Sequence, residues 1–254
     1  MTHRSKLCSV EIAKMRTNRF YQDSELLLGQ KIALAKEVSN HISRVLRLKD
    51  AAEITLFNGD GANYQATITV EGKSVTALIT NKSDANNESP LNIHLGQAIS
   101  RGERMDFTLQ KSVELGVSHI TPLISERVQF RYDEKRLKKK MHHWQKIIES
   151  ACEQSGRAVI PTLMSPLSLH DWLLKDKQPG LLFVPGATTN IKDLPVQETL
   201  RLLVGPEGGL SDAEVELSLN TKHFTALNLG PRILRTETAA LAAISILQAQ
   251  FGDI

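Results

Sequence analysis

The sequence predicts an α/β protein in which a small β-rich domain precedes a larger domain with a parallel sheet. Short segments of alternating or β-branched residues fill the first third of the chain. A polar segment at 81–90 follows and is predicted to be a linker. After it, apolar runs alternate with longer helical patterns. Such regular alternation is typical of a parallel sheet covered by helices.

The first domain is predicted to be a small β-barrel with one helix. Its strands are expected at 31–36, 52–57, 64–70 and 74–81. Turn signals, NGDG and EGK, separate the last three of these segments. One helix is expected at 37–48, where apolar residues recur at helical spacing. A barrel closed by this helix is the simplest way to bury the strands.

The second domain is predicted to contain five strands and at least three helices. The strands are the apolar runs at 91–97, 119–124, 181–185, 200–205 and 224–230. One helix is expected from Glu103 to Leu115, with Gly116 as the residue that ends it. A second is expected at 133–155, and a third begins at about Glu237. The predicted domain bounds are 15–85 and 86–254, with 1–14 as an appendage and Met15 as an alternative start.

Composition excludes several classes of protein. The net charge of +3 is compatible with nucleic-acid binding but does not establish it. Cys8 and Cys152 are too few for a disulfide framework or a zinc site, and we expect no metal. The longest apolar run, 239–251, is too short and too polar to span a bilayer. No signal pattern opens the chain, so we expect a cytoplasmic protein without a membrane partner.

The stretch GPEGG at 205–209 is a candidate ligand loop. It joins a predicted buried strand to a helix whose start, Ser211 to Glu214, matches a capping box. Open α/β sheets bind ligands at such strand ends. The loop lacks the lysine of a P-loop, and Glu207 would repel a pyrophosphate. A tight connection without function is the alternative interpretation.

A second loop repeats this layout. The strand at 224–229 is followed by Gly230-Pro231, and Thr236 is the predicted N-cap of the last helix. Arg232 and Arg235 flank an apolar pair in the loop. These arginines suit oxyanions such as RNA phosphates, although surface ion pairing would also explain them.

Together the two loops resemble a known family. The motifs LLVGPEGGLSDAEV and LNLGPRILRTETAALAA are similar to those of the RsmE-type ribosomal RNA small-subunit (uracil-N3) methyltransferases of the SPOUT superfamily. Segments at 101–129 and 143–161 resemble the same family, and the segments at 19–22 and 41–61 resemble its PUA-like RNA-binding barrel. The resemblance covers about residues 15–252.

The resemblance implies a PUA-like barrel followed by a SPOUT α/β domain with a C-terminal trefoil knot. It implies methylation of uridine N3 in 16S ribosomal RNA, with S-adenosylmethionine as cofactor, a homodimer, and a substrate within the assembled 30S particle. FVPGA at 183–187 would be a further part of the pocket, although the family often has glutamate in place of Gly186. The cofactor-binding residues that it implies are Leu203, Val204, Gly205, Pro206, Glu207, Gly208, Gly209, Leu229, Gly230, Arg232, Ile233, Leu234, Arg235 and Thr236.

The catalytic residues predicted are Arg127, Glu153 and Arg157. A carboxylate with a raised pKa would accept the N3 proton, and Glu126, Glu153 and Glu207 are all open candidates. Either arginine would stabilise charge on a uracil oxygen. The residues predicted to bind RNA are Arg16, Arg19, Arg44, Arg47, Arg127 and Arg131. Arg44 and Arg47, three residues apart, are expected to share a helix face, and the aromatic residues Phe20 and Tyr21 suit base stacking.

Two other functions remain open at this point. The chain would also suit an RNA-binding assembly factor that has lost catalysis. It would equally suit a SPOUT enzyme acting on transfer RNA, since physical argument from the sequence does not identify the RNA. The presence of both glycine-proline loops favours the ribosomal RNA methyltransferase.

Overall fold

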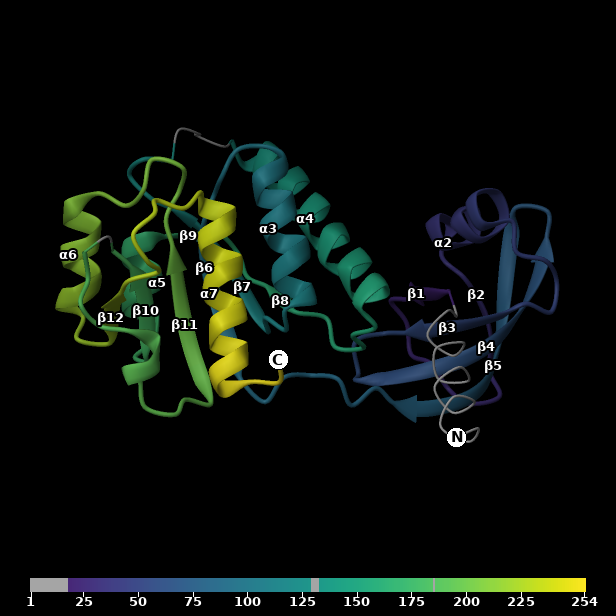
Figure 1. Cartoon of the computed structure of the whole chain (residues 1–254). Coiled ribbons are helices and arrows are strands. Elements are labelled where there is room, and N and C mark those ends of the chain that lie inside the picture. The colour runs from purple at the N-terminus through teal and green to yellow at the C-terminus, as the bar shows by residue number, and fades with distance from the viewer. Residues whose placement is uncertain (1–17, 129–132, 185) are drawn as a thin grey trace, which may run out of the picture. The chain divides into compact units, whose positions relative to one another are not determined.

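The computed structural model divides into two compact units, drawn in Figure 1. It describes residues 18–128, 133–184 and 186–254. The predicted appendage at 1–14 lies outside the described residues. The first unit contains the described residues up to Asn87 together with Cys152–Ile160, and the second contains the rest.

The grouping of Cys152–Ile160 with the first unit is not foreseen by the sequence. The segment's first four residues are the end of the helix α4 (Glu134–Ser155), and its contacts are with the first unit. The Gly61 N–H donates to the Ala158 carbonyl at 3.3 Å, and Asn87 Nδ2 donates to the Gly156 carbonyl at 3.0 Å. These hydrogen bonds join residues far apart in sequence, which local patterns do not reveal.

The first unit is built on a five-stranded sheet with the order β1-β3-β4-β5-β2. β1 and β3 are parallel, and the other pairs are antiparallel. Its elements are β1 (Arg19–Tyr21), β2 (Lys31–Ala33), α2 (Lys36–Asn40), the π-helical turn η1 (His41–Leu46), β3 (Glu53–Phe57), β4 (Ala62–Glu71) and β5 (Ser74–Asp84). The apolar side chains of the strands and of Ile42 form one core.

Three local predictions for this unit need correction. The predicted linker begins too early, because β5 stays paired with β4 as far as Asp84. The single helix predicted at 37–48 becomes α2 followed by η1, and it ends at Leu46 because Arg47 has φ of +51°. β1 was not predicted, since a three-residue strand is too short to show an alternating pattern.

The second unit has a seven-stranded sheet, and every strand pair in it is parallel. This confirms the predicted parallel sheet. Six strands follow the order β12-β10-β11-β6-β7-β8, and β9 pairs with β7. The strands are β6 (Asn92–Ala98), β7 (His119–Ile124), β8 (Thr162–Leu163), β9 (Leu167–Ser168), β10 (Gly180–Phe183), β11 (Thr199–Val204) and β12 (Phe224–Leu227).

Helices cover both faces of this sheet (Figure 1). Neighbouring residues of β6 show this, because successive side chains of a strand point to opposite faces. The Cα of Gly96 faces the Trp172 ring of α5, whereas the Gln97 side chain bonds to Thr236 of α7. The helical elements are α3 (Glu103–Glu114), α4 (Glu134–Ser155), α5 (Leu169–Lys175), the 3-10 turn η2 (Ile191–Asp193), α6 (Asp212–Asn220) and α7 (Thr236–Phe251).

The helix boundaries in this unit agree closely with the sequence. α3 ends as predicted before Gly116, which has φ of +84°. The capping box at the start of α6 is also confirmed, because Ser211 Oγ accepts from the Glu214 N–H at 3.1 Å. Thr236 was predicted as the N-cap of α7, but it is the first helical residue and Arg235 is the cap. The hydroxyl of Thr236 is engaged elsewhere, as shown below.

Gly96 is required by its contact with Trp172. A Cβ at this position would lie 2.6 Å from the indole ring, and both residues are buried. We therefore expect Gly96→Ala to lower the free energy of unfolding by about 1–3 kcal/mol. Urea denaturation measures this change. In a Trp172→Phe background the alanine should cost less, and an equal cost in both backgrounds would contradict this explanation.

Candidate functional site

The first candidate loop follows β11 directly. The Gly209 N–H donates to the Pro206 carbonyl at 2.9 Å, which closes a tight turn. Gly209 has φ of +71°, a value that favours glycine. At Gly205 a Cβ would meet the Leu210 backbone N at 3.0 Å. Gly205 and Gly209 therefore allow the tight turn of this loop.

The second loop follows β12, which lies in the same sheet. The Gly230 N–H donates to Asn228 Oδ1 at 2.9 Å, and Gly230 has φ of +97°. Ile233 in this loop is 93% exposed, which is unusual for so large an apolar side chain. Because both strands are parallel, both loops leave the sheet at its carboxyl edge.

The two loops line one pocket of about 670 Å³. All the residues that the sequence assigned to cofactor binding line it, except Arg235. Phe183, Val184 and Gly186 add a third wall, as predicted for the end of β10. The volume lies in the range of small-molecule sites. The loops therefore line one pocket, although GPEGG also makes a tight turn.

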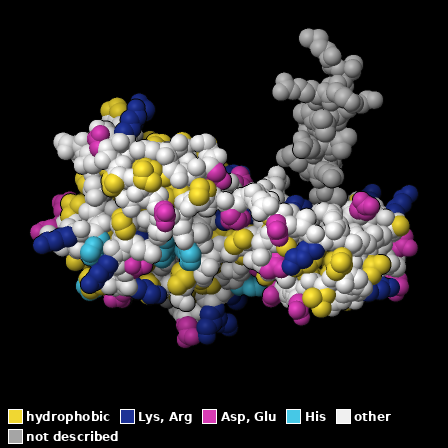
Figure 2. All heavy atoms as spheres, turned by 90° about the horizontal axis from the view of Figure 1, so that it is seen from below, with side chains coloured by type: hydrophobic (Ala, Val, Ile, Leu, Met, Phe, Trp, Pro, Cys, Tyr) yellow, Lys and Arg dark blue, Asp and Glu magenta, His cyan; other side chains and the backbone are white. Residues whose placement is uncertain are grey.

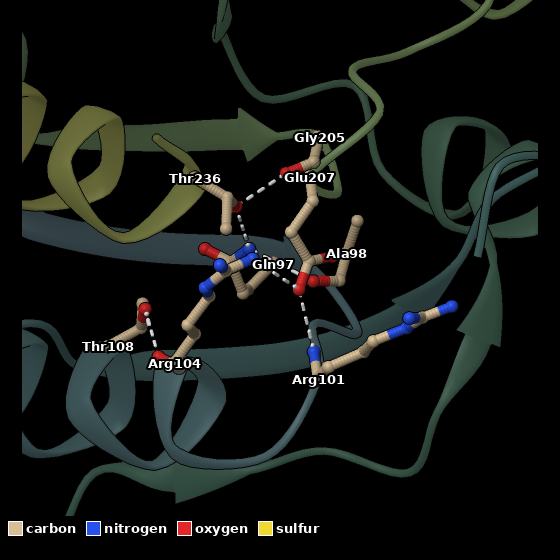
Figure 3. A network of polar contacts seen from close by, with 8 residues as sticks. All are labelled: Gln97, Ala98, Arg101, Arg104, Thr108, Gly205, Glu207 and Thr236. Carbon is tan, nitrogen blue, oxygen red and sulfur yellow. Dashed lines mark hydrogen bonds and ion pairs between the residues drawn. The ribbon is translucent and has the colours of Figure 1, made fainter. Parts of the chain in front are cut away.

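A buried hydroxyl joins the two loops to β6 (Figure 3). Thr236 Oγ1 donates to the Gly205 carbonyl at 2.6 Å and accepts from Gln97 Nε2 at 2.9 Å. Gln97 Nε2 also donates to the Ala98 carbonyl at 2.9 Å. Gln97 and Thr236 are 0% and 5% exposed. These bonds fix the start of the first loop against the end of the second.

The Glu207 carboxylate holds the first loop on the segment between β6 and α3. Its Oε1 accepts from the Arg101 backbone N–H at 2.9 Å and from Arg104 Nη1 at 3.3 Å (Figure 3). Burial acts to raise the pKa of this carboxyl, but hydrogen bonds from Arg101, from its own backbone and from Arg104 lower it overall. Glu207 is therefore ionised at neutral pH, but its lowered pKa makes it a weak base, and this argues against it as the proton acceptor.

Arg127 lies against the same loop. Its Nη1 donates to the Gly208 carbonyl at 2.8 Å and to the Leu210 carbonyl at 3.1 Å. The neighbouring Glu126 N–H donates to Glu214 Oε1 at 2.8 Å, so the segment after β7 is tied to the start of α6. Arg127, one of the predicted catalytic residues, therefore contacts this loop.

Comparison with known proteins identifies the family. Residues 87–248 match the RNA methyltransferase domain family, and residues 34–80 match the RNA methyltransferase PUA domain family. The chain belongs to the ribosomal RNA small subunit methyltransferase E family. It combines a PUA-like domain with an α/β methyltransferase domain of the SPOUT type.

Two relatives and two solved structures illustrate this membership. The Ribosomal RNA small subunit methyltransferase E of Buchnera aphidicola subsp. Schizaphis graminum is 41% identical over 95% of this chain and 99% of its own. The Bacillus subtilis protein of the same name is 30% identical over 86% and 90%. A methyltransferase from Legionella pneumophila with bound SAM has a TM-score of 0.91 at 46% identity, covering 94% of this chain and 100% of its own. The Neisseria gonorrhoeae family member bound to S-adenosyl methionine has a TM-score of 0.88 at 41% identity, with the same coverage.

Glu153 and Arg157, the other two predicted catalytic residues, belong to the first unit. Glu153 Oε1 accepts from the Tyr21 backbone N–H at 2.9 Å. The Arg157 carbonyl accepts from Arg19 Nη2 at 3.2 Å, and Arg157 is 4% exposed. The part of Glu153 and Arg157 in catalysis stays a prediction.

The predicted RNA-binding residues have varied surroundings. Arg16 and Arg131 lie outside the described residues. Arg19 is engaged in packing, because its guanidinium lies over the Phe57 ring at 5.0 Å and Nη1 donates to Asn63 Oδ1 at 2.6 Å. Burial lowers its pKa despite the nearby Cys152 and Glu153.

Arg44 and Arg47 are both exposed, but they do not share a helix face as predicted, because the helix ends between them. Phe20, which the sequence suggested for base stacking, is 3% exposed and belongs to the core of the first unit. On the face drawn in Figure 2, basic and acidic side chains are interspersed and do not form one basic patch.

Among the described residues, no group of three or more His, Cys, Asp or Glu side chains is arranged to hold a metal ion. No helix in the described part of the chain is both long and apolar enough to cross a membrane.

The sequence did not indicate Gln97, Arg101 or Arg104 as parts of the site. Gln97 is a polar residue at the end of an apolar run, and its polarity was the one sequence feature that could have marked it as part of the site. Arg101 acts on Glu207 through its backbone, which no sequence pattern reports.

The Thr236 hydroxyl gives a direct test of the link between the loops. Thr236→Val keeps the shape but leaves Gln97 Nε2 and the Gly205 carbonyl without this buried partner. We expect a loss of about 1–3 kcal/mol in the free energy of unfolding and weaker binding of the family's cofactor. Denaturation and titration calorimetry measure the two effects. Thr236→Ser, which keeps the hydroxyl, is the control, and similar behaviour of both variants would show that the hydroxyl is unimportant.

Proposed function

We propose that this chain transfers a methyl group from S-adenosylmethionine to N3 of a uridine in 16S ribosomal RNA. The observation that carries the proposal is the single pocket formed by the two glycine-proline loops. Solved relatives at 46% and 41% identity hold the same methyl donor. Curated relatives carry the name Ribosomal RNA small subunit methyltransferase E, and the N3 position rests on the motifs of the family.

The pocket suits a ligand with a flat ring and a polar tail. The apolar side chains of Leu203, Leu229 and Leu234 line it. The positive φ angles of Gly209 and Gly230 allow backbone groups to approach a ligand without a Cβ between them. We therefore assign cofactor binding to the predicted residues of both loops.

When bound, S-adenosylmethionine supplies an electrophilic methyl group. The task of the chain is to orient the uracil and to favour loss of its N3 proton. Arg127, held by two carbonyls of the first loop, is suited to stabilise the negative charge that develops on a uracil oxygen. Glu126 and Glu153 stay open as proton acceptors, and Arg157 as a second stabilising group.

We propose that the methyltransferase domain contains a trefoil knot. Two features support it. β12 and β11 lie on opposite sides of β10, and after β12 the chain returns to α7, which packs on α3 and β11. This return passes the segment between β10 and β11, where the Asn228 N–H meets the Thr189 carbonyl at 3.4 Å.

We also propose a homodimer, supported by the exposure of Ile233 beside the pocket. Covering this side chain with a second copy would remove apolar surface from water.

The PUA-like domain, predicted at 15–85, is proposed to dock on ribosomal RNA in the 30S particle in the cytoplasm. The exposed Arg44 and Arg47 would contact phosphates there.

Methyl mapping of ribosomal RNA tests the proposed function. We expect 16S RNA from a strain lacking the gene to lose one methyl group on a uridine. The purified protein should restore it on 30S particles from that strain. An unchanged map would reject the proposal, and a methyl group missing from transfer RNA would assign a different substrate. Failure to bind S-adenosylmethionine at millimolar concentration would favour an RNA-binding factor without catalysis.

Gly209→Val tests the assignment of the first loop. The φ of +71° is strained for a β-branched residue, and the new side chain would stand where the loop approaches its ligand. We expect affinity for S-adenosylmethionine to fall roughly tenfold or more. Gly72→Val is the matched control, since Gly72 has φ of +63° in the turn between β4 and β5. Retained affinity in Gly209→Val would remove this loop from the site.

Arg44→Glu tests RNA docking by the PUA-like domain. Reversing this exposed charge should weaken RNA binding by roughly tenfold while leaving cofactor affinity unchanged. Filter binding and calorimetry report the two affinities. Lys73→Glu, in the turn before β5, is a control of equal charge change. A parallel fall in both affinities would indicate a structural role for Arg44.

A further inference from the structure

A second cavity adjoins the pocket of the two loops. It has a volume of about 420 Å³ and shares only Glu207 and Gly208 with that pocket. It lies beyond the carboxyl ends of β6 and β7, of which β6 is next to β11 in the sheet and β7 is next to β6. Its lining residues are Ile99, Arg101, Arg104, Glu126, Arg127, Val128, Glu207 and Gly208.

Three arginines line this cavity. In the contacts described below, Arg104 and Arg127 use only part of their hydrogen-bonding capacity. Arg104 and Arg127 each act through Nη1, on Glu207 and on two carbonyls of the first loop respectively. Arg101 holds Glu207 through its backbone N–H, and its side chain points away from that carboxylate (Figure 3). A guanidinium has five N–H donors, so these contacts leave donors of Arg104 and Arg127 for a ligand.

The charges of the cavity favour an anion. Three arginines line it together with two carboxylates, those of Glu126 and Glu207. Glu207 is already neutralised by Arg104 and by a backbone N–H. Arginine forks match the oxygens of a phosphate, with which they make bidentate hydrogen bonds.

We propose that this cavity binds a backbone phosphate of the RNA beside the target uridine, with Arg101 and Arg104 as its main contacts. The inference rests on the proposed function and adds to it a binding site for the acceptor strand. A phosphate held here would be separated from the methyl-donor pocket only by Glu207 and Gly208. It would thus fix the position of the neighbouring base relative to that pocket.

The carboxylate tail of the methyl donor is the alternative occupant. It is the weaker candidate, because the first pocket, at about 670 Å³, is large enough for a complete small ligand and contains its own cation, Arg232. Both occupants are anions, so the experiment must separate them.

Arg101→Gln is the informative variant. It removes the guanidinium but keeps the backbone N–H that holds Glu207. With 30S particles from the deletion strain, we expect KM to rise roughly three- to tenfold and kcat to stay unchanged. The slope of log KM against log salt concentration should fall by about 0.7–0.9, as for the loss of one phosphate contact. Lys177→Gln is the control, since this exposed lysine precedes β10 at the opposite edge of the sheet.

Each other outcome has a definite meaning. A KM and salt slope equal to those of the control would overturn the inference while leaving the methyltransferase function intact. Weaker binding of S-adenosylhomocysteine, with unchanged binding of 5′-methylthioadenosine, would also overturn it, because it would place the tail of the donor in this cavity. Absence of methyl transfer by the unmodified protein would instead reject the proposed function itself.

Discussion

The site depends on one buried hydroxyl. Thr236 Oγ1 bonds to the Gly205 carbonyl and to Gln97 Nε2, and it thereby joins three segments that lie far apart in sequence. A parallel sheet brings the carboxyl ends of its strands to one edge, but it does not fix the loops that follow them. Removing a partner from such a buried bond is costly, so the bond holds both loops in one arrangement. The pocket exists because these loops are held together.

Glu207 has a structural part in the same arrangement. Its carboxylate is kept ionised by Arg101 and Arg104, and it stands between the pocket of the loops and the cavity lined by arginines. This explains why a carboxylate is compatible with a loop that is rich in glycine. In a phosphate-binding loop the charge would be repulsive, whereas here it anchors the loop to the segment before α3.

Several features of the fold and of the site were predictable from the sequence. The capping box of Ser211 and Glu214 and the glycine after α3 are local features, and local rules located them correctly. The strand order was not predictable, because apolar runs mark strands without saying which strands are neighbours. Contacts of high sequence separation, such as Gln97 with Thr236, were missed for the same reason. Phe20 looked available for RNA because β1 was too short to recognise as part of a core.

β11 is held by hydrogen bonds at both of its ends. At the amino end, buried Arg201 donates to the carbonyls of Trp172 and of Asp176, the latter at 2.9 Å, and its guanidinium lies 3.9 Å from the Trp172 ring centroid. Burial lowers the pKa of Arg201 to about 10, so it remains charged at neutral pH and able to satisfy these carbonyls. At the carboxyl end, Thr236 holds Gly205. The strand therefore has no freedom to slide, and the loop that follows it starts from a fixed point, as a site that must align two reactants requires.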